Sequence, residues 1–388
     1  MNKLSYQNYY FLGAGGIGMS ALIRYFAYNG KNVLGYDKTS TQLTKTLENE
    51  GIKIHYTDSP ELIPAELTPE NTLVIYTPAV PSDLKELAYF KEKEFDLLKR
   101  AEVLGDLTRD TFCIGVAGTH GKTTTTTLLG HILHYAKLES TAFCGGISQN
   151  YGSNLIGHGQ KITVVEADEY DRSFLKLSPN ISIVTSVDAD HLDIYQKEED
   201  FVFAFQEYAL KVTPDNLFVN YGLPFEDAVT YGISPESDIC AQNIRVEKDQ
   251  FVFDIKHYQE TISDIKMDLP GRHNIKNATA AFAVAKKLGL DSEIIKEAIE
   301  SFKGIKRRFT RHKINGKVYI DDYAHHPTEI NAAISAAREL YPSKKMLVVF
   351  QPHLFSRTKD FADEFALSLQ KADTVLLLDI YPYHRFSK

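Results

Sequence analysis

A glycine- and threonine-rich loop is the clearest chemical feature of this 388-residue chain. The apolar run 112–117 leads into Gly-Thr-His-Gly-Lys-Thr-Thr-Thr-Thr-Thr, residues 118–127, which is typical of a loop between a strand and a helix. Glycines at 118 and 121 allow backbone N–H groups to surround phosphate oxygens. Lys122 adds a positive charge for the β- and γ-phosphates, and Thr123 offers a hydroxyl to Mg2+. The loop therefore predicts ATP binding.

The loop departs from the usual pattern G-x-x-x-x-G-K-[ST] at one position. That pattern requires glycine at 116, whereas the chain has Val116 there and Gly115 one residue too early. An isolated Gly-Lys-Thr often has no ligand, but the preceding strand and the following helix favour phosphate binding here. We interpret residues 118–124 as a variant phosphate loop.

Acidic side chains follow two further apolar strands, expected at 162–167 and 181–187. The clusters are Glu166, Asp168 and Glu169, then Asp188, Asp190, His191 and Asp193. Carboxyl ends of parallel strands share one edge of a sheet, so we expect both clusters beside the phosphate loop, where they would bind Mg2+ or Mn2+. His191 could bind a second ion or contact the transferred phosphoryl group. The alternative is that both clusters are solvated loops.

A second glycine-rich loop, Gly-Ala-Gly-Gly-Ile-Gly, occupies residues 13–18 after a strand expected at 9–12. It opens a helix, and Asp37 stands at the end of the next strand, as in dinucleotide-binding folds. Such a loop holds a pyrophosphate, which NAD and UDP-sugars share, so the motif does not choose between them.

A helix expected at 274–288 begins with two asparagines, Asn274 and Asn277. Their paired donors and acceptors suit an adenine edge. Helix N-capping by Asn274 is an equally good explanation.

Polar residues also end two strands near the C-terminus, in Asp-Asp-Tyr-Ala-His-His-Pro at 321–327 and Gln-Pro-His-Leu-Phe-Ser-Arg at 351–357. A carboxylate, a histidine and an arginine together could recognise an amino acid as nucleophile. The alternative for the paired histidines is a helix start, with Pro327 in the first turn.

Composition narrows the class of protein. The net charge of −8, without a basic cluster large enough for nucleic acid, argues against that partner. Three widely separated cysteines predict buried thiols in a reducing compartment. Neither a signal peptide nor a membrane span is expected, so we predict a cytoplasmic enzyme.

Alternating strands and helices predict an α/β protein with parallel sheets and more than one domain. A polar stretch at 91–110 suggests the first boundary, and the basic run 306–308 suggests the second. The expected domains are 1–107, 108–308 and 309–388. The last shows strand candidates only at 318–320, 346–350 and 374–379, and we expect it to be incomplete or unusually small.

Taken together, these motifs resemble the Mur ligase family in order and spacing over nearly the whole chain. The strings that carry the resemblance are Gly-Ala-Gly-Gly-Ile-Gly-Met-Ser, Ala-Gly-Thr-His-Gly-Lys-Thr-Thr-Thr-Thr, Glu-Ala-Asp-Glu, Asp-Ala-Asp-His-Leu-Asp, Gly-Arg-His-Asn-Ile-Lys-Asn-Ala, Asp-Asp-Tyr-Ala-His-His-Pro and Phe-Gln-Pro-His. The resemblance implies a Rossmann-like domain for a UDP-sugar, a central ATPase-like domain and a C-terminal Rossmann-like domain. It favours UDP-sugar over NAD at the first loop.

The resemblance also implies roles for individual residues. The ATP-binding residues would be Gly118, Thr119, His120, Gly121, Lys122, Thr123, Thr124, Asn274 and Asn277. The metal ligands would be Thr123, Glu166 and His191. The UDP-substrate would meet Gly13, Gly15, Gly16, Ile17, Gly18 and Asp37, and the amino acid and muramoyl carboxylate would meet Asp322, His325 and Arg357. Leu354 replaces an arginine usual in the family, so anion recognition would depend on Arg357.

The activity implied is ATP-dependent joining of L-alanine to the carboxylate of UDP-N-acetylmuramic acid, a step of peptidoglycan precursor synthesis. An acyl phosphate would form first, and alanine's amine would then displace phosphate. Three alternatives stay open: a ligase of the same family that adds a tripeptide in murein recycling, an NAD-dependent oxidoreductase, and a shortened nucleotide-binding product without activity. Oligomeric state cannot be derived from these motifs.

Overall fold

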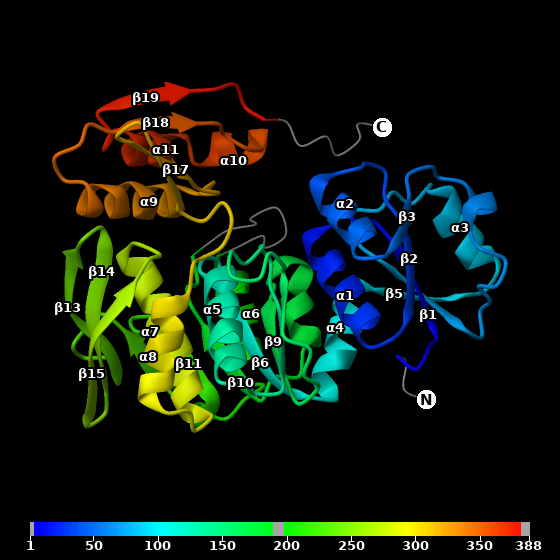
Figure 1. Ribbon diagram of the computed structural model, residues 1–388, viewed down its shortest axis with the longest axis horizontal. Coiled ribbons are helices and arrows are strands. Elements are labelled where there is room, and N and C mark those ends of the chain that lie inside the picture. Colours follow the sequence, from blue (N-terminus) through cyan, green and yellow to red (C-terminus); the bar gives the residue numbers. More distant parts are fainter. Residues whose placement is uncertain (1–3, 189–197, 382–388) are drawn as a thin grey trace. The chain divides into compact units, whose positions relative to one another are not determined.

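The computed structural model describes residues 4–188 and 198–381, and the chain forms two compact units, Met1–Val229 and Thr230–Lys388 (Figure 1). None of the helices in these described ranges has the length and apolar character needed to cross a bilayer. Cys113, Cys144 and Cys240, all within the described ranges, are buried free thiols, as predicted.

The first unit begins with a parallel sheet in the order β3-β2-β1-β4-β5. Central strand β1 is buried along its whole length because helices cover both faces of the sheet. The strands are β1 (Asn8–Leu12), β2 (Asn32–Tyr36), β3 (Lys53–His55), β4 (Thr72–Tyr76) and β5 (Asp96–Lys99). The helices are α1 (Ile17–Tyr28), α2 (Gln42–Asn49), α3 (Lys85–Glu92) and α4 (Arg100–Arg109), with the short 3-10 helix η1 (Pro60–Leu62).

The same unit contains a second run of strands in the order β8-β7-β9-β6-β10-β11. All its pairs are parallel except β7 with β8. The strands are β6 (Phe112–Ala117), β7 (Ser140–Phe143), β8 (Leu155–Ile156), β9 (Ile162–Ala167), β10 (Ile181–Val184) and β11 (Leu217–Asn220). The helices are α5 (Lys122–Tyr135) and α6 (Glu198–Ala209), with η2 (Tyr170–Lys176) and η3 (Pro214–Asn216). Because β6 lies between β9 and β10, their carboxyl ends meet at one edge, as predicted.

One apolar core joins the two sheets of the first unit. It runs from Tyr9 on β1 through Phe26 on α1 to Phe143 on β7 and Val165 on β9. Residues 91–110, which we expected to be a polar separator, instead contain β5 and α4. Val103, Leu104 and Leu107 form a buried stripe on α4 that the surrounding charges hide in the sequence.

Glu86 is a buried carboxyl beneath the first sheet, with no exposed surface. It accepts a hydrogen bond from Tyr10 Oη at 2.7 Å and lies 3.5 Å from His55 Nε2. Burial raises the pKa of Glu86 to about 7, although the Tyr10 hydroxyl and the Ser59 N–H oppose this shift.

The second unit opens with strands in the order β15-β14-β13-β12, followed by a helical pair and a smaller α/β region. The strands are β12 (Val229–Gly232), β13 (Ile239–Glu247), β14 (Gln250–His257) and β15 (Glu260–Met267), and the helices are α7 (Arg272–Lys287) and α8 (Ser292–Ser301). The smaller region has β16 (Thr310–Ile314), β17 (Lys317–Asp321), α9 (Pro327–Leu340), β18 (Leu347–Phe350), α10 (Phe355–Asp360), α11 (Ala362–Leu369) and β19 (Thr374–Leu377).

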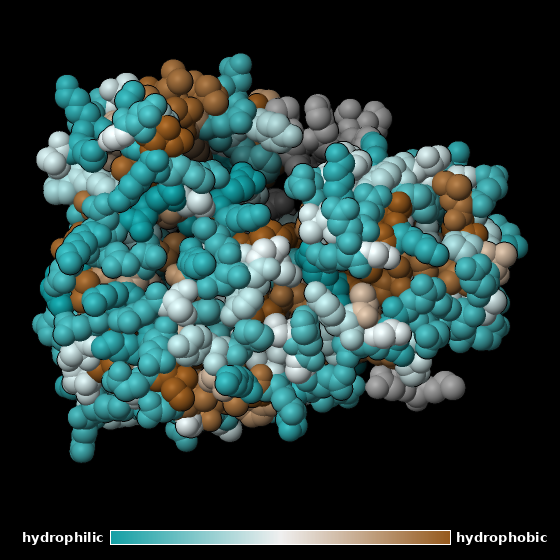
Figure 2. All heavy atoms as spheres, in the orientation of Figure 1, coloured by the Kyte–Doolittle hydropathy of each residue, from teal (hydrophilic) through white to brown (hydrophobic). Residues whose placement is uncertain are grey.

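The parallel pair β18–β19 packs one face on a small core that includes Ile330, Ile334 and Phe365. Its apolar side chains Leu347 and Leu377 are more than half exposed. Figure 2 shows hydrophobic residues gathered over this pair. The strands expected at 318–320, 346–350 and 374–379 are present, and β16 is an additional strand that pairs with β17.

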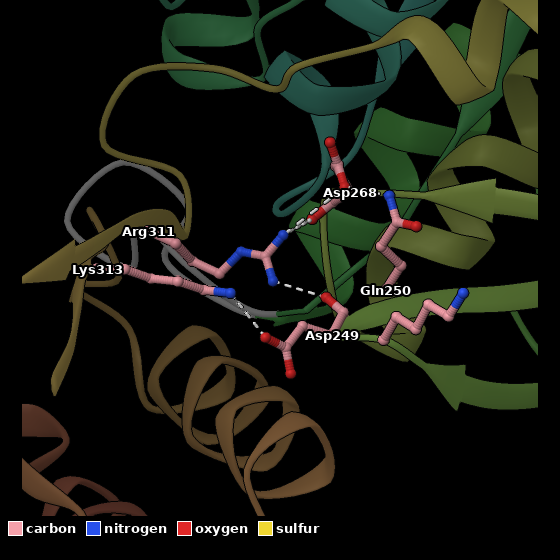
Figure 3. A pocket seen from close by; sticks show the side chains of 6 residues that line it. Asp249, Gln250, Asp268, Arg311 and Lys313 are labelled. Carbon is pink, nitrogen blue, oxygen red and sulfur yellow. Dashed lines mark hydrogen bonds and ion pairs between the residues drawn. The ribbon is translucent and has the colours of Figure 1, made fainter. Parts of the chain in front are cut away.

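A polar pocket of the second unit lies where the turn of the β13–β14 hairpin and the end of β15 meet β16 (Figure 3). Arg311 Nη1 donates to the Asp249 carbonyl at 2.7 Å, and Lys313 Nζ lies 2.8 Å from Asp249 Oδ2. Arg311 also donates to the Asp268 carbonyl at 3.1 Å. The residues lining this pocket are Lys248, Asp249, Gln250, Asp268, Arg311 and Lys313. Because Arg311 and Lys313 already bind acids and carbonyls, we interpret this pocket as a structural contact that holds β16 in place.

Candidate active site

The loop between β6 and α5 has the geometry of a phosphate cradle. Gly121 adopts φ +86° as the N-cap residue of α5, so the N-terminus of a 14-residue helix faces the loop. Gly118 adopts φ +135°, and a Cβ there would overlap Thr185 Oγ1 and lie 2.8 Å from Ser186 N. Only glycine fits the backbone at position 118.

Residues after β10 hold this loop in place. Ser186 Oγ accepts from His120 N at 2.8 Å, and Thr185 Oγ1 donates to the His120 carbonyl at 2.5 Å. Thr119 Oγ1 donates to the Asp188 carbonyl at 2.8 Å. Hydrogen bonds therefore link the loops at the carboxyl ends of β6 and β10, which lie together at the expected edge of the sheet.

Lys122 lies inside the cradle and is paired with a buried acid. Its Nζ is 2.7 Å from Glu169 Oε2 and donates to the Gly118 carbonyl at 2.5 Å. Burial lowers the pKa of Lys122, but the charges of Glu169 and Asp168 together raise it above its ordinary value. The ammonium is thus held in the charged form, and phosphate binding by Lys122 stays a prediction.

Thr123 and Glu166 lie together as predicted. Thr123 Oγ1 donates to Glu166 Oε2 at 3.1 Å, and Glu166 Oε1 accepts from Gly145 N at 2.5 Å. Burial raises the pKa of Glu166, while the Gly145 N–H and the Lys122 charge oppose the shift. A hydroxyl and a carboxylate are oxygen ligands that suit Mg2+, whose remaining positions are commonly filled by phosphates and water.

Part of the predicted metal site lies outside the described residues, namely Asp190, His191 and Asp193. Within the ranges 4–188 and 198–381, the structure places no group of three or more His, Cys, Asp and Glu side chains to hold a metal. Two protein ligands beside a phosphate cradle are consistent with a metal bound largely through the nucleotide.

The other glycine-rich loop, residues 13–18, connects β1 to α1. Gly13 adopts φ +86°, and the N–H groups of Gly13 and Ala14 donate to the Tyr36 carbonyl. Asp37 Oδ2 accepts from Gly15 N at 2.7 Å, so this acid fixes the loop itself. Gly16, Ile17 and Gly18 begin α1, and Gly16 is its N-cap residue. The predicted pyrophosphate contacts of this loop stay predictions.

Arg100 is a further candidate site residue, which the sequence reasoning missed. It starts α4, its guanidinium lies against Gly18, and its Nη2 is 4.0 Å from Asp168 Oδ2. A positive charge therefore stands between the glycine-rich loop and the acids after β9. The basic pair Lys99-Arg100 after the apolar pair Leu97-Leu98 was the available signal.

In the second unit, Asn274 and Asn277 are buried in the first turns of α7. Asn274 Nδ2 donates to the Pro270 carbonyl at 2.6 Å, and Asn277 Nδ2 donates to Asn274 Oδ1 at 3.3 Å. The N-cap residue is Gly271, so the alternative explanation, that Asn274 caps this helix, is wrong. Adenine contact by these asparagines stays a prediction.

The C-terminal candidates differ in how they are engaged. Asp322 accepts from Phe309 N at 2.8 Å and from Ala324 N at 2.7 Å, and burial raises its pKa although these N–H groups oppose the shift. His325 Nδ1 lies 3.3 Å from Glu329 Oε2. Arg357 lies in the last turn of α10.

The alternative of a helix start is confirmed beside these residues. His326 is the N-cap residue of α9, and Pro327 occupies its first turn. Leu354 precedes α10 with φ +70°.

Comparisons with known proteins identify the family of this chain. Residues 8–111 match the model "Mur ligase family, catalytic domain", residues 116–285 match "Mur ligase middle domain", and residues 307–385 match "Mur ligase, glutamate ligase domain". The UDP-N-acetylmuramate–L-alanine ligase of Flavobacterium psychrophilum is 57% identical over 98% of this chain and 86% of that relative. This chain belongs to the Mur ligase family.

Other Mur ligases extend the comparison. The L-alanine ligase of Phocaeicola vulgatus is 46% identical over 98% of this chain and 86% of its own length. The solved structure of UDP-N-acetylmuramate–alanine ligase from Thermotoga maritima superposes with TM-score 0.84 at 30% identity, covering 96% of this chain and 85% of that one. A murein peptide ligase from Psychrobacter arcticus shares the fold, with TM-score 0.71 at 22% identity over 96% of this chain and 91% of that one. The three-domain α/β class predicted from the motifs is confirmed, whereas the boundaries at 107 and 308 stay predictions.

Proposed function

We propose that this Mur ligase joins L-alanine to the carboxylate of UDP-N-acetylmuramic acid, with conversion of ATP to ADP and phosphate. The observation that carries the proposal is identity of 46–57% along almost the whole chain to ligases of that name. The buried Lys122 in a glycine-built cradle supports the ATP-dependent step.

The first step of the proposed reaction is acyl activation. A muramoyl carboxylate oxygen attacks the γ-phosphorus of ATP, the bond to the β–γ bridging oxygen breaks, and ADP leaves. Lys122 neutralises charge on the transferred phosphoryl group, and the N–H groups at the start of α5 bind phosphate oxygens. Mg2+, held by Thr123 and Glu166, would reduce the repulsion between the two anions.

The second step forms the amide. The amine of alanine attacks the acyl carbon, phosphate leaves, and the amine loses a proton. Both carboxylate oxygens of Asp322 already accept backbone N–H groups, whereas the His325 ring is oriented through Nδ1, which lies 2.9 Å from the Tyr323 carbonyl and 3.3 Å from Glu329 Oε2. We therefore favour His325 over Asp322 as the base.

A coupled assay of ADP release tests the proposal. The protein is mixed with ATP, Mg2+ and UDP-N-acetylmuramic acid, and L-alanine is compared with glycine, L-serine and the tripeptide L-alanyl-γ-D-glutamyl-meso-diaminopimelate. We expect ADP release that depends on both substrates and is fastest with L-alanine. Faster turnover with the tripeptide would assign the murein-recycling activity instead.

Two controls separate the remaining alternatives. Nicotinamide fluorescence on mixing NADH with the protein should not change, because the first glycine-rich loop is assigned to a UDP-sugar. Omission of Mg2+ with added chelator should stop ADP release. Turnover that continues without any divalent metal would remove the role given to Thr123 and Glu166.

A further inference from the structure

Asn154, at the end of the loop between β7 and β8, is a buried amide whose polar atoms all contact other residues. Its Nδ2 donates to the Ile17 carbonyl at 2.5 Å and to Ser20 Oγ at 3.1 Å. Its Oδ1 accepts from Arg24 Nη1. All three partners lie on α1, the helix that begins at the glycine-rich loop, so one side chain grips the first two turns of that helix.

The contact with Arg24 explains how a charged group is tolerated there. The Arg24 side chain is 2% exposed, and its other nitrogens donate to both carboxylate oxygens of Glu50 at 2.8 and 2.9 Å. Asn154 supplies an acceptor for Arg24 Nη1, the guanidinium nitrogen that Glu50 does not bind. A buried arginine is destabilising when its N–H groups lack acceptors. The contacts of Asn154 therefore fix both the position and the orientation of α1.

The other end of the same loop reaches the candidate metal ligand. The Asn154 carbonyl accepts from Cys144 N at 2.9 Å, and the next residue, Gly145, donates its N–H to Glu166 at 2.5 Å. A Cβ at Gly145 would lie 2.7 Å from both Glu166 oxygens. Residues 144–154 thus connect Glu166, beside the phosphate loop, to the helix that carries the glycine-rich loop.

We propose that Asn154 is a positioning residue that sets the separation between the two loops. This inference rests on the proposed function, in which the UDP-sugar lies on the glycine-rich loop and its carboxylate must reach the γ-phosphate. Reacting atoms need contact at about 3–3.5 Å, and a displacement of about 1 Å can lower the rate on the order of a hundredfold. Loss of the Asn154 contacts should therefore reduce turnover more than the binding of either substrate.

The test compares three variants in the ADP-release assay. Asn154→Ala removes all the side-chain contacts, whereas Asn154→Asp keeps an acceptor for Arg24 but loses the donor to Ile17. Gln160→Ala is the matched control, because Gln160 Nε2 donates at 2.5 Å to Asn29 Oδ1 at the opposite end of α1. Thermal unfolding shows whether each variant folds. If Asn154→Ala does not fold, the kinetics of Asn154→Asp test the inference.

We expect both Asn154 variants to lose at least tenfold in kcat, with each KM within about threefold of the parent value. Gln160→Ala should match the parent protein. A raised KM for one substrate with unchanged kcat, or unchanged kinetics in a folded Asn154→Asp variant, would overturn the inference.

A binding measurement separates this inference from the proposed function. If the parent protein releases no ADP with UDP-N-acetylmuramic acid and L-alanine, the proposed function fails. The affinity for a non-hydrolysable ATP analogue is also measured with and without the UDP-substrate. The UDP-substrate should change the affinity for the analogue at least threefold less in Asn154→Asp than in the parent protein. An equal change in affinity in both proteins would refute the positioning role.

Discussion

Replacing Gly118 by alanine should damage the phosphate cradle in a way that can be measured against a closely matched control. Gly118 has φ +135°, and its added Cβ would overlap Thr185 Oγ1 and approach Ser186 N to 2.8 Å. Gly222 also has positive φ, +92°, but nothing lies within 4 Å of an added Cβ there. Gly222→Ala therefore reports backbone strain alone, and Gly118→Ala reports strain together with a collision.

The expected magnitudes follow from this difference. An L-residue held at an unfavourable φ costs about 1–3 kcal/mol, which applies to both variants. Forcing an extra methyl group into a packed site adds about 1–3 kcal/mol at Gly118 alone. Thr185 cannot turn away without loss, since its hydroxyl donates to the His120 carbonyl at 2.5 Å. Gly118→Ala should thus be less stable than Gly222→Ala by about 1–3 kcal/mol.

Urea unfolding and titration with a fluorescent ATP analogue measure the two consequences. Gly222→Ala should bind the analogue like the parent protein, whereas Gly118→Ala should lose at least tenfold in affinity because the loop must move. Adding Thr185→Ala to Gly118→Ala removes the nearest colliding atom, so the double-mutant cycle should show a favourable coupling of about 0.5–3 kcal/mol. Equal stability and equal affinity of the two glycine variants would refute the cradle geometry.

Three other predictions concern different parts of the chain. Lys122→Ala should reduce ADP release by at least a thousandfold, while calorimetry should show that the UDP-substrate still binds; loss of both would contradict the separate roles. Burial raises the pKa of Glu86 from 4.5 to about 7, so the stability linked to its protonated form is complete below pH 4.5 and is lost as pH rises through 7. In urea unfolding, the free energy of unfolding should fall by at most about 3 kcal/mol over this pH range, and Glu86→Gln should not show this fall. If the free energy of unfolding of Glu86→Gln had the same dependence on pH, the explanation would be wrong. Arg311→Ala should speed hydrogen exchange in β16, because its contacts with the Asp249 and Asp268 carbonyls are lost. Arg245→Ala, which removes an exposed ion pair on the same hairpin, should not. Equal exchange rates in both variants would show that Arg311 does not hold β16 in place.

The sequence predicted those elements whose burial leaves continuous apolar runs. The strands expected at 9–12 and 162–167 correspond to β1 and β9, because both are covered on two sides and contain few charges. By contrast, α4 shows only a narrow apolar stripe among charged residues, and β15 buries Ile262, Ile265 and Met267 without a regular alternation. Those two elements owe their identity to partners distant in the chain, which periodicity alone does not reveal.

The candidate site divides in the same way. Thr123 and Glu166 could be paired from the sequence because Thr123 follows β6, Glu166 lies near the end of β9, and both strands end at one sheet edge. Arg100 and Asn154 could not, because their roles depend on contacts with α1 and the glycine-rich loop that only the folded chain creates. Predictions on His191 concern a residue outside the described ranges and stay predictions.

The apolar core that extends from β1 through α1 to β7 and β9 matters for anyone who divides this chain or recombines it with a relative. Tyr25 on α1 packs on Phe143, with ring centroids 5.4 Å apart. In a fragment that ends at residue 107, Tyr25 would be exposed to water. Phe143 would be exposed on the fragment that remains. Chimeras should therefore exchange residues 1–229 as a block, because a junction inside that block would place mismatched aromatic surfaces against each other.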